Sequence, residues 1–130
     1  MRNYLVDGTN AARRGGFDPR FPQVEQGRTQ DLLEKWSRLA EPLNGRIRIE
    51  VFFDGPRREV GSFSPPVFVR FPTDQSADDA ILGSARRLLN EGKGAVVVTA
   101  DGALAREAED EGARVLSVSA FEQRLRDDRA

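Results

Sequence analysis

The stretch Tyr4-Leu5-Val6-Asp7-Gly8-Thr9-Asn10 decides how the rest of the chain is interpreted. Three consecutive apolar residues predict a short strand that is buried on both faces. An aspartate, a glycine, a hydroxyl and an amide follow at once, and open α/β sheets carry their chemistry at such strand ends. Asp7 is therefore the first candidate for a functional side chain. The simpler interpretation is that Asp-Gly forms a turn, or that Asp7 caps a following helix.

The composition is typical of a folded domain and excludes several kinds of catalysis. The chain has 130 residues, of which 38% are hydrophobic and 32% charged, so we expect residues 1–130 to form one domain. It has no histidine and no cysteine, which excludes imidazole and thiolate chemistry. Catalysis would then use carboxylates, hydroxyls or cationic side chains, with a hard metal ion bound by oxygen. No apolar run is long enough to cross a bilayer and no signal-peptide pattern is present, so we expect a cytoplasmic protein without membrane contact.

Strands that alternate with helices predict an α/β fold. The strands are expected at residues 4–6, 47–53, 67–69, 95–99 and 113–118, and the helices at 29–43, from 76 to the glycine at 92, at 103–111 and at 120–128. Continuous apolar strands indicate a mainly parallel sheet of about five strands with helices on both faces. Pro65-Pro66 favours an edge position for the third strand. Residues 11–27 are expected to form a long, arginine-rich loop.

Aspartates follow the predicted buried strands. Asp7, Asp54 and Asp101 each come within two residues of the last apolar residue of a strand. Parallel strands end at the same edge of a sheet, and the helix that begins near residue 76 brings Asp78 and Asp79 to that edge as well. Carboxylates at close range raise one another's pKa and repel, so they need a cation or a shared proton. A divalent metal ion bound by oxygen is the natural compensation.

Each of these aspartates also has a purely structural interpretation. Ser76 and Asp79 have the spacing of a capping box, and Asp101 could cap the helix that follows it. Asp54 could belong to an ordinary turn. The coincidence of all five at one edge favours a site, and Asn10 adds a neutral oxygen ligand there.

Four motifs, taken in order, resemble those of the NYN/PIN-like nucleases. They are Val6-Asp7-Gly8-Thr9-Asn10, Phe53-Asp54-Gly55, Ser76-Ala77-Asp78-Asp79-Ala80-Ile81 and Val98-Thr99-Ala100-Asp101. The bacterial YacP-like proteins are the most similar branch, although Thr9 stands where tyrosine is common and Ser76 where threonine is common. The resemblance implies a PIN-like (Rossmann-like) three-layer sandwich. It also implies metal-dependent hydrolysis of RNA, as an endoribonuclease, with Mg²⁺ or Mn²⁺ as cofactor and possible association with the ribosome.

The same resemblance implies roles for individual residues. Asp7, Asp78 and Asp101 would bind the metal ion, Asp54 and Asp79 would support them, Asn10 would help to position them, and Thr99 would lie beside Asp101. Arginines in the loops near the acidic edge would hold the RNA backbone; the candidates are Arg13, Arg14, Arg57, Arg58 and Arg70.

Two other functions fit parts of the sequence. Asp7-Gly8-Thr9 also occurs in phosphatases of the haloacid-dehalogenase type, but that family has a second aspartate at the position of Leu5. The other alternative is a non-catalytic RNA-binding regulatory module with a structural metal ion. An aspartyl-phosphate would identify the first, and RNA binding without cleavage would identify the second.

Overall fold

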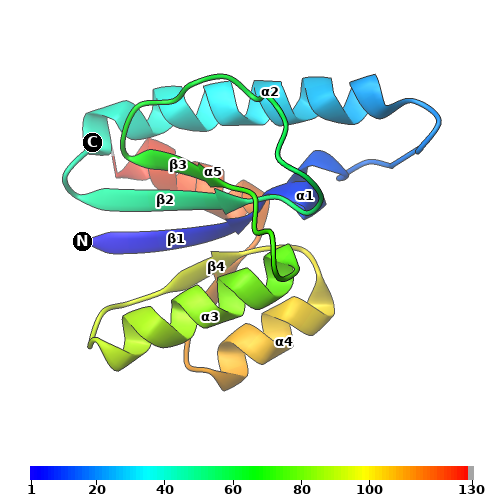
Figure 1. Cartoon of the computed structure of the whole chain (residues 1–130). Coiled ribbons are helices and arrows are strands. Elements are labelled where there is room, and N and C mark those ends of the chain that lie inside the picture. Colours follow the sequence, from blue (N-terminus) through cyan, green and yellow to red (C-terminus); the bar gives the residue numbers. More distant parts are fainter. Residues whose placement is uncertain (129–130) are drawn as a thin grey trace.

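The computed structural model describes residues 1–128 and confirms the predicted α/β fold. Five parallel strands form one sheet in the order β3-β2-β1-β4-β5 (Figure 1). The strands are β1 (Arg2–Asp7), β2 (Ile47–Phe52), β3 (Val67–Arg70), β4 (Val96–Val98) and β5 (Arg114–Leu116). The helices are α1 (Gly8–Ala12), α2 (Pro22–Ala40), the 3-10 turn η1 (Glu41–Leu43), α3 (Ala77–Asn90), α4 (Gly102–Asp110) and α5 (Val118–Asp127). As predicted, β3 is an edge strand.

Helices cover both faces of the sheet, because β1 and β4 are apolar on both sides. Alternate residues of β1 contribute to two separate cores: Tyr4 and Val6 pack with α1, α2 and α5, whereas Leu5 packs with α3 and α4. Figure 1 shows α2 on one side of the sheet and α3 and α4 on the other. Since all neighbouring strands pair in parallel, all five end at the same edge of the sheet.

Trp36 lies in the core, as its position on the apolar stripe of α2 predicts, and is fully buried. Its indole Nε1 donates a hydrogen bond to Oε2 of the buried Glu122 at 2.8 Å, and Nζ of Lys35 lies 2.9 Å from the same oxygen. Burial raises the pKa of Glu122, but the hydrogen bonds from Lys35 and Trp36 outweigh it, so the pKa lies below its usual value. The buried Glu122 carboxylate of α5 is therefore joined to α2 by its contacts with Trp36 and Lys35.

The largest departure from the sequence prediction is the start of α2. The helix begins at Pro22, inside the segment expected to be a loop, and not near Thr29. Proline is well suited to the first turn of a helix, because its missing N–H has no partner there in any case. The first two turns carry no apolar stripe, so the hydrophobic period that reveals a helix starts only at about Thr29. α1 also extends to Ala12, two residues into the predicted loop.

The chain after β4 differs from the prediction only at element ends. β5 is shorter than expected, and Val118, assigned to the last strand, is the first residue of α5. The reason is Ser117, whose Oγ accepts a hydrogen bond from Ala120 N at 3.0 Å and so caps the helix. Within residues 1–128, no helix combines the length and the apolar character that a membrane span requires.

Candidate active site

The polar ends of β1 and β4 meet where the strand order of the sheet reverses. The chain runs outward through β2 and β3 on one side of β1 and through β4 and β5 on the other. Open α/β sheets bind ligands at this position, outside the carboxyl ends of the strands. Asp7 is the last residue of β1, and Thr99 directly follows β4. Thr99 Oγ1 donates a hydrogen bond to Asp7 Oδ2 at 3.0 Å, and Ala100 N donates one to Asn10 Oδ1 at 2.9 Å.

The carboxylate of Asp7 accepts hydrogen bonds from α1 and from the residue that follows β4. Its side chain is buried, with the residue only 4% exposed, and Oδ1 accepts a hydrogen bond from Asn10 N at 3.2 Å. Asp7 therefore caps α1, as its simpler interpretation predicted. Burial raises the pKa of Asp7, and the two hydrogen bonds lower it by less.

Gly8 allows the chain to turn directly after Asp7. A Cβ atom at this position would lie 2.6 Å from Cε1 of Phe53 and 2.8 Å from Cγ1 of Val51. Both neighbours are buried, so they have no free space into which to move. Only glycine lets α1 start so close to β2, and this approach fixes where Asp7 lies.

Thr99 links the two ends of the site. Besides donating to Asp7, its Oγ1 accepts a hydrogen bond from Asp101 N at 3.0 Å. Oδ1 of Asp101 accepts from Ala103 N at 2.9 Å and Leu104 N at 3.2 Å, so Asp101 caps α4. Because the capping bonds use one oxygen, Oδ2 of Asp101 accepts no hydrogen bond within the described part of the chain and is available to a ligand.

Asp54 is fixed from two directions. Its N–H donates to Thr9 Oγ1 at 2.8 Å, and its Oδ1 accepts from Ala77 N at 2.8 Å. The second bond ties the loop after β2 to the first residue of α3. Thr9 is therefore a positioning residue that the sequence marked only as a difference from the family pattern. The Thr9 hydroxyl provides a hydrogen-bond acceptor for the backbone N–H of Asp54, which would otherwise lack a partner.

Asp78 has the most perturbed carboxyl group of the site. It is half-buried in the first turn of α3, where Ser76 Oγ accepts a hydrogen bond from Asp79 N at 3.1 Å. Burial, followed by the negative charges of Asp7, Asp101, Asp54 and Asp79, raises the pKa of Asp78 to about 6. The charges of the other four predicted carboxylates are therefore all close enough to act on Asp78. A cation placed there would relieve the repulsion.

The carboxylates do not enclose a metal ion by themselves. Across residues 1–128, no three acidic side chains are close enough to form a ready-made cation site. The donor chemistry nevertheless fits Mg²⁺ or Mn²⁺, because all candidate ligands are oxygens and the chain has no histidine or cysteine. Magnesium takes one or two carboxylates and completes its shell with water and substrate phosphates. Asp7, Asp78 and Asp101 suit such a hydrated ion.

The predicted arginines divide into paired and free side chains. Arg58 Nη1 donates to the carbonyl oxygens of Asp54 at 3.0 Å and Pro56 at 3.1 Å, so it orders its own loop. Arg70 Nε lies 3.3 Å from Oε2 of Glu50, in an ion pair at the sheet edge. Arg57 and Arg14 are exposed and form no ion pair within residues 1–128. They remain the better candidates for contact with a phosphate.

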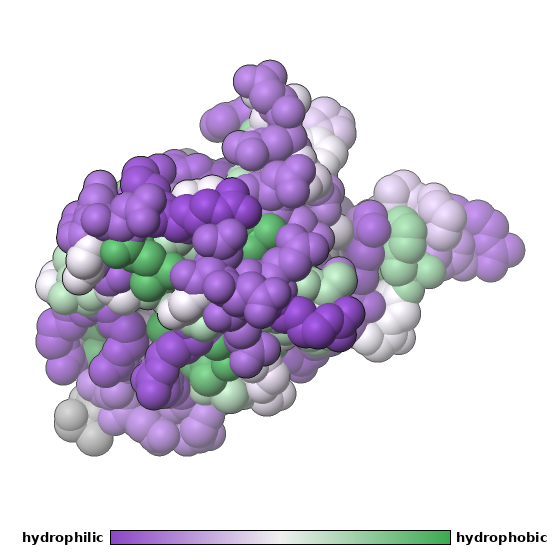
Figure 2. Space-filling view, turned by 90° about the horizontal axis from the view of Figure 1, so that it is seen from below, coloured by the Kyte–Doolittle hydropathy of each residue, from purple (hydrophilic) through white to green (hydrophobic). Residues whose placement is uncertain are grey.

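The segment of residues 13–24, called the arm below, projects beyond the carboxyl edge of the sheet (Figure 1). Arg13 stacks over the ring of Phe17 at 3.7 Å and pairs with Glu25 at 2.5 Å. Phe17 and Phe21 are 47% and 49% exposed, and Val24 is 48% exposed. Figure 2 shows apolar surface among hydrophilic surface on this projection. Aromatic rings in a loop rich in arginine, glycine and proline were the sequence signal for this surface, and the prediction of an arginine-rich loop did not include them.

Comparisons with known proteins agree with this geometry. A family model described as "YacP-like NYN domain" matches residues 5–130. Two crystal structures of Rae1 (YacP) from Bacillus subtilis, one of them the W164L mutant, are similar in fold, each with a TM-score of 0.71. The mutant is 22% identical and the other 23% identical; the alignments cover 96% of this chain and 75% and 74% of theirs, respectively. No curated protein sequence matches the chain.

The family model extends over nearly the whole sequence, including every strand end described above. NYN domains are nuclease-like and related to RNA. The chain therefore belongs to the YacP-like NYN domain family.

Proposed function

We propose that the protein is a metal-dependent endoribonuclease that hydrolyses RNA phosphodiesters at the carboxyl edge of its sheet. The observation that carries the proposal is the electrostatic environment of Asp78 at the strand-order reversal, where burial, and after it the negative charges of four nearby aspartates, raises its pKa. A divalent ion bound there would neutralise the scissile phosphate and activate a water molecule. Membership of the family favours this reaction over a phosphatase of the haloacid-dehalogenase type.

The residues of the chain have separate tasks in this proposal. Asp7 and Asp101 are held rigid by Thr99 and would present fixed oxygens to the ion. Asp78 has no hydrogen bond to its carboxylate among the described residues, so its oxygens are available to the ion, whose positive charge would lower the pKa that burial and the neighbouring aspartates raise. Asp54, Asp79 and Asn10 would support the cluster.

The substrate would approach over the arm. Exposed phenylalanines stack on bases without sequence preference, and arginines hold the phosphate backbone. Phe17 and Phe21 lie on the arm with Arg14, next to the end of α1. Single-stranded RNA is therefore the preferred substrate in this proposal. A cytoplasmic location and association with the ribosome stay predictions.

The test is cleavage of RNA by the purified protein with Mn²⁺ or with EDTA. A labelled circular single-stranded RNA has no ends, so its conversion to a linear product identifies endonucleolytic action. Wild type should cleave it with Mn²⁺ and not with EDTA, and Asp78→Asn should be at least 100-fold slower. Asp110→Asn removes an exposed carboxylate at the end of α4, far from the site, and should cleave like wild type.

Two outcomes contradict the proposal. If wild type binds the RNA but leaves it intact under both conditions, the RNA-binding module is the correct interpretation. If wild type and Asp78→Asn cleave at the same rate, the reaction takes place without the acidic cluster.

A further inference from the structure

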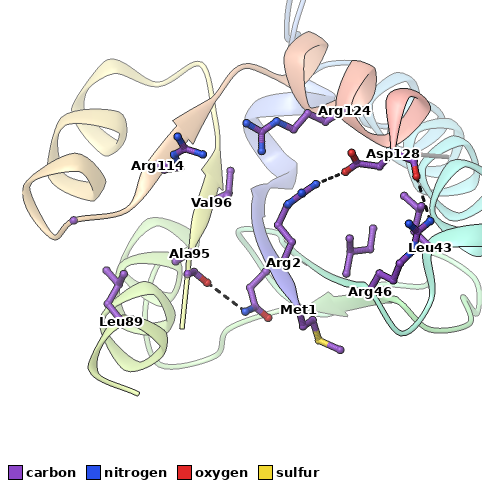
Figure 3. A pocket seen from close by; sticks show the side chains of 14 residues that line it. Met1, Arg2, Leu43, Arg46, Leu89, Ala95, Val96, Arg114, Arg124 and Asp128 are labelled. Atoms are coloured by element: carbon purple, nitrogen blue, oxygen red, sulfur yellow. Dashed lines mark hydrogen bonds and ion pairs between the residues drawn. The ribbon is translucent and has the colours of Figure 1, made fainter. Parts of the chain in front are cut away.

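A second concave site lies at the opposite edge of the sheet, where the strands begin. It is a cavity of about 540 Å³ between the starts of β1, β2, β4 and β5 and the last turn of α5 (Figure 3). Four arginines line it, namely Arg2, Arg46, Arg114 and Arg124, and Asp128 is the one acidic residue among the lining residues. With four positive charges against one negative charge, the lining carries a net charge of +3, whereas the whole chain has a net charge of −1.

The strand register explains why the arginines converge. Val96 of β4 pairs with Tyr4 on one side and with Arg114 on the other, so Arg114 projects from the face that α5 covers. Arg2 precedes Tyr4 by two residues and therefore projects from the same face. Arg124 comes from the last turn of α5, above that face. Gly94 precedes β4 and also lines the cavity, and a Cβ atom there would meet nothing within 4 Å, so the cavity is open beside Gly94.

Asp128 contacts only two of the four arginines, and its one negative charge compensates only Arg2. Its carboxylate forms an ion pair with Arg2, and its backbone carbonyl oxygen accepts a hydrogen bond from Arg46 Nη2 at 3.2 Å. Within residues 1–128, Arg114 and Arg124 form no ion pair. Figure 3 shows their side chains directed towards the same space above Val96, beside Arg2. Two free guanidinium groups that face one cavity repel each other unless an anion lies between them.

The chemistry of the cavity identifies the anion. Guanidinium groups bind phosphate through paired N–H donors, and two of them match the charge of a phosphate monoester. The volume lies within the range of small-molecule sites, about 300–1,000 Å³. Beside the cations, Leu43, Ile47 and Val96 form an apolar wall that is almost fully buried, and Leu89 adds a partly exposed apolar side chain. This combination fits a nucleotide, with its phosphate at the arginines and its base against the wall.

We propose that this cavity binds the terminal phosphate monoester of a nucleotide, either free or as the 5′ end of an RNA. The site is separate from the acidic cluster, because the two lie at opposite ends of the strands. It needs no metal ion. Binding can therefore be measured in EDTA, independently of any cleavage.

The test is titration of the intact chain with AMP, adenosine and inorganic phosphate in EDTA, by calorimetry and chemical-shift mapping. AMP should bind and perturb residues at the starts of β1, β4 and β5, phosphate should compete with it, and adenosine should bind at least 10-fold more weakly. Arg114→Gln with Arg124→Gln should weaken AMP binding at least 10-fold. The matched control is Arg38→Gln, which removes an exposed arginine from the last turn of α2, outside the cavity, and should bind AMP like wild type.

Two further measurements keep the result decisive. A 5′-phosphorylated dinucleotide that binds at least 10-fold tighter than its 5′-hydroxyl form identifies the RNA end as the ligand, whereas binding of AMP alone identifies a free nucleotide. Unliganded, the double variant should melt at or above the wild-type temperature, because it removes a repulsion, so lost binding cannot be attributed to unfolding. The proposal is overturned if neither AMP nor the phosphorylated dinucleotide binds at millimolar concentration, or if Arg38→Gln weakens binding as much as the double variant.

Discussion

Replacement of Asp78 by asparagine should raise the free energy of unfolding of the metal-free protein at pH 7.5. Asparagine has nearly the shape of aspartate, so the substitution removes the charge and keeps the packing. Burial and the surrounding carboxylates raise the pKa of Asp78 from 3.8 to about 6. The ionised side chain therefore destabilises the folded state at neutral pH. Removing the charge in Asp78→Asn should therefore recover the stability that the folded protein loses at this site.

The expected magnitude follows from the pKa. A rise of about two units corresponds to about 3 kcal/mol, at about 1.4 kcal/mol per unit. Solvent screens part of this effect, because Asp78 is only half-buried. The negative charge also interacts favourably with the amino end of α3, which is worth about 0.3–1 kcal/mol and is lost in the variant. We expect a net gain of about 1–2 kcal/mol.

The gain should depend on pH in a defined direction. A carboxyl group with a raised pKa in the folded state binds its proton more tightly there than in the unfolded state. Wild type therefore recovers the lost stability as the pH falls from about 6 towards 3.8, the window between the two pKa values. The advantage of Asp78→Asn should be largest above pH 7 and should disappear near pH 4. With Mn²⁺ at pH 7.5, wild type should instead be more stable than Asp78→Asn, because an ion that binds only the folded wild type stabilises it.

Urea unfolding followed by circular dichroism, at pH 7.5 and at pH 4–5, with EDTA or Mn²⁺, measures these quantities. Asp79→Asn is the matched control. It makes the same change at the next residue, which is exposed, and should not raise the stability by more than about 0.5 kcal/mol. If Asp78→Asn in EDTA at pH 7.5 is no more stable than wild type, the carboxylates do not repel one another as described.

Three other predictions concern the fold and the arm. Gly8→Ala should lower the free energy of unfolding by about 1–3 kcal/mol, because its Cβ would overlap buried side chains; Gly83→Ala, in the exposed middle of α3 with nothing within 4 Å, should instead raise it by about 0.5–1 kcal/mol. Equal effects of the two changes in urea titrations would contradict the close approach at Gly8. Glu122→Gln should lower stability by about 1–3 kcal/mol at pH 7. Because the pKa of Glu122 is lowered in the folded state, its contribution is present above about pH 4.5 and lost below it, so the difference from wild type should shrink in acid; a constant difference from pH 3 to pH 7 would show that the charge plays no part. Phe17→Ala and Phe21→Ala should each weaken binding of single-stranded RNA by about 1–3 kcal/mol, that is by roughly 5- to 150-fold, in fluorescence anisotropy without metal, and leave duplex binding unchanged. An equal loss for both RNAs would mean that the rings do not stack on bases.

Much of the site could be predicted from the sequence, because local rules govern it. A short apolar strand that ends in a polar residue places that residue at the carboxyl edge of a parallel sheet, whatever the details of packing. Asp7 and Asp101 were located in this way. Their role as helix caps was also visible, and the structure shows that capping and ligand binding are compatible, because capping leaves an oxygen of Asp101 free.

Other features depend on contacts that the sequence does not display. The first turns of α2 lack a hydrophobic period, because they project past the sheet on the arm and have no core to cover. Thr9 meets the backbone of Asp54 only through the packing of α1 against β2. The basic cavity joins residues as distant as Arg2 and Arg124, which only the strand order and the position of α5 bring together.

The most direct test of a divalent ion at the acidic edge is anomalous diffraction from a crystal soaked in Mn²⁺, recorded above and below the manganese absorption edge. The proposal predicts a peak within about 2–3 Å of carboxylate oxygens from Asp7, Asp78 or Asp101, and no such peak in Asp78→Asn crystals soaked in the same way. A wild-type crystal without a peak at these residues, under conditions in which the protein cleaves RNA, would contradict a metal-dependent reaction at this edge.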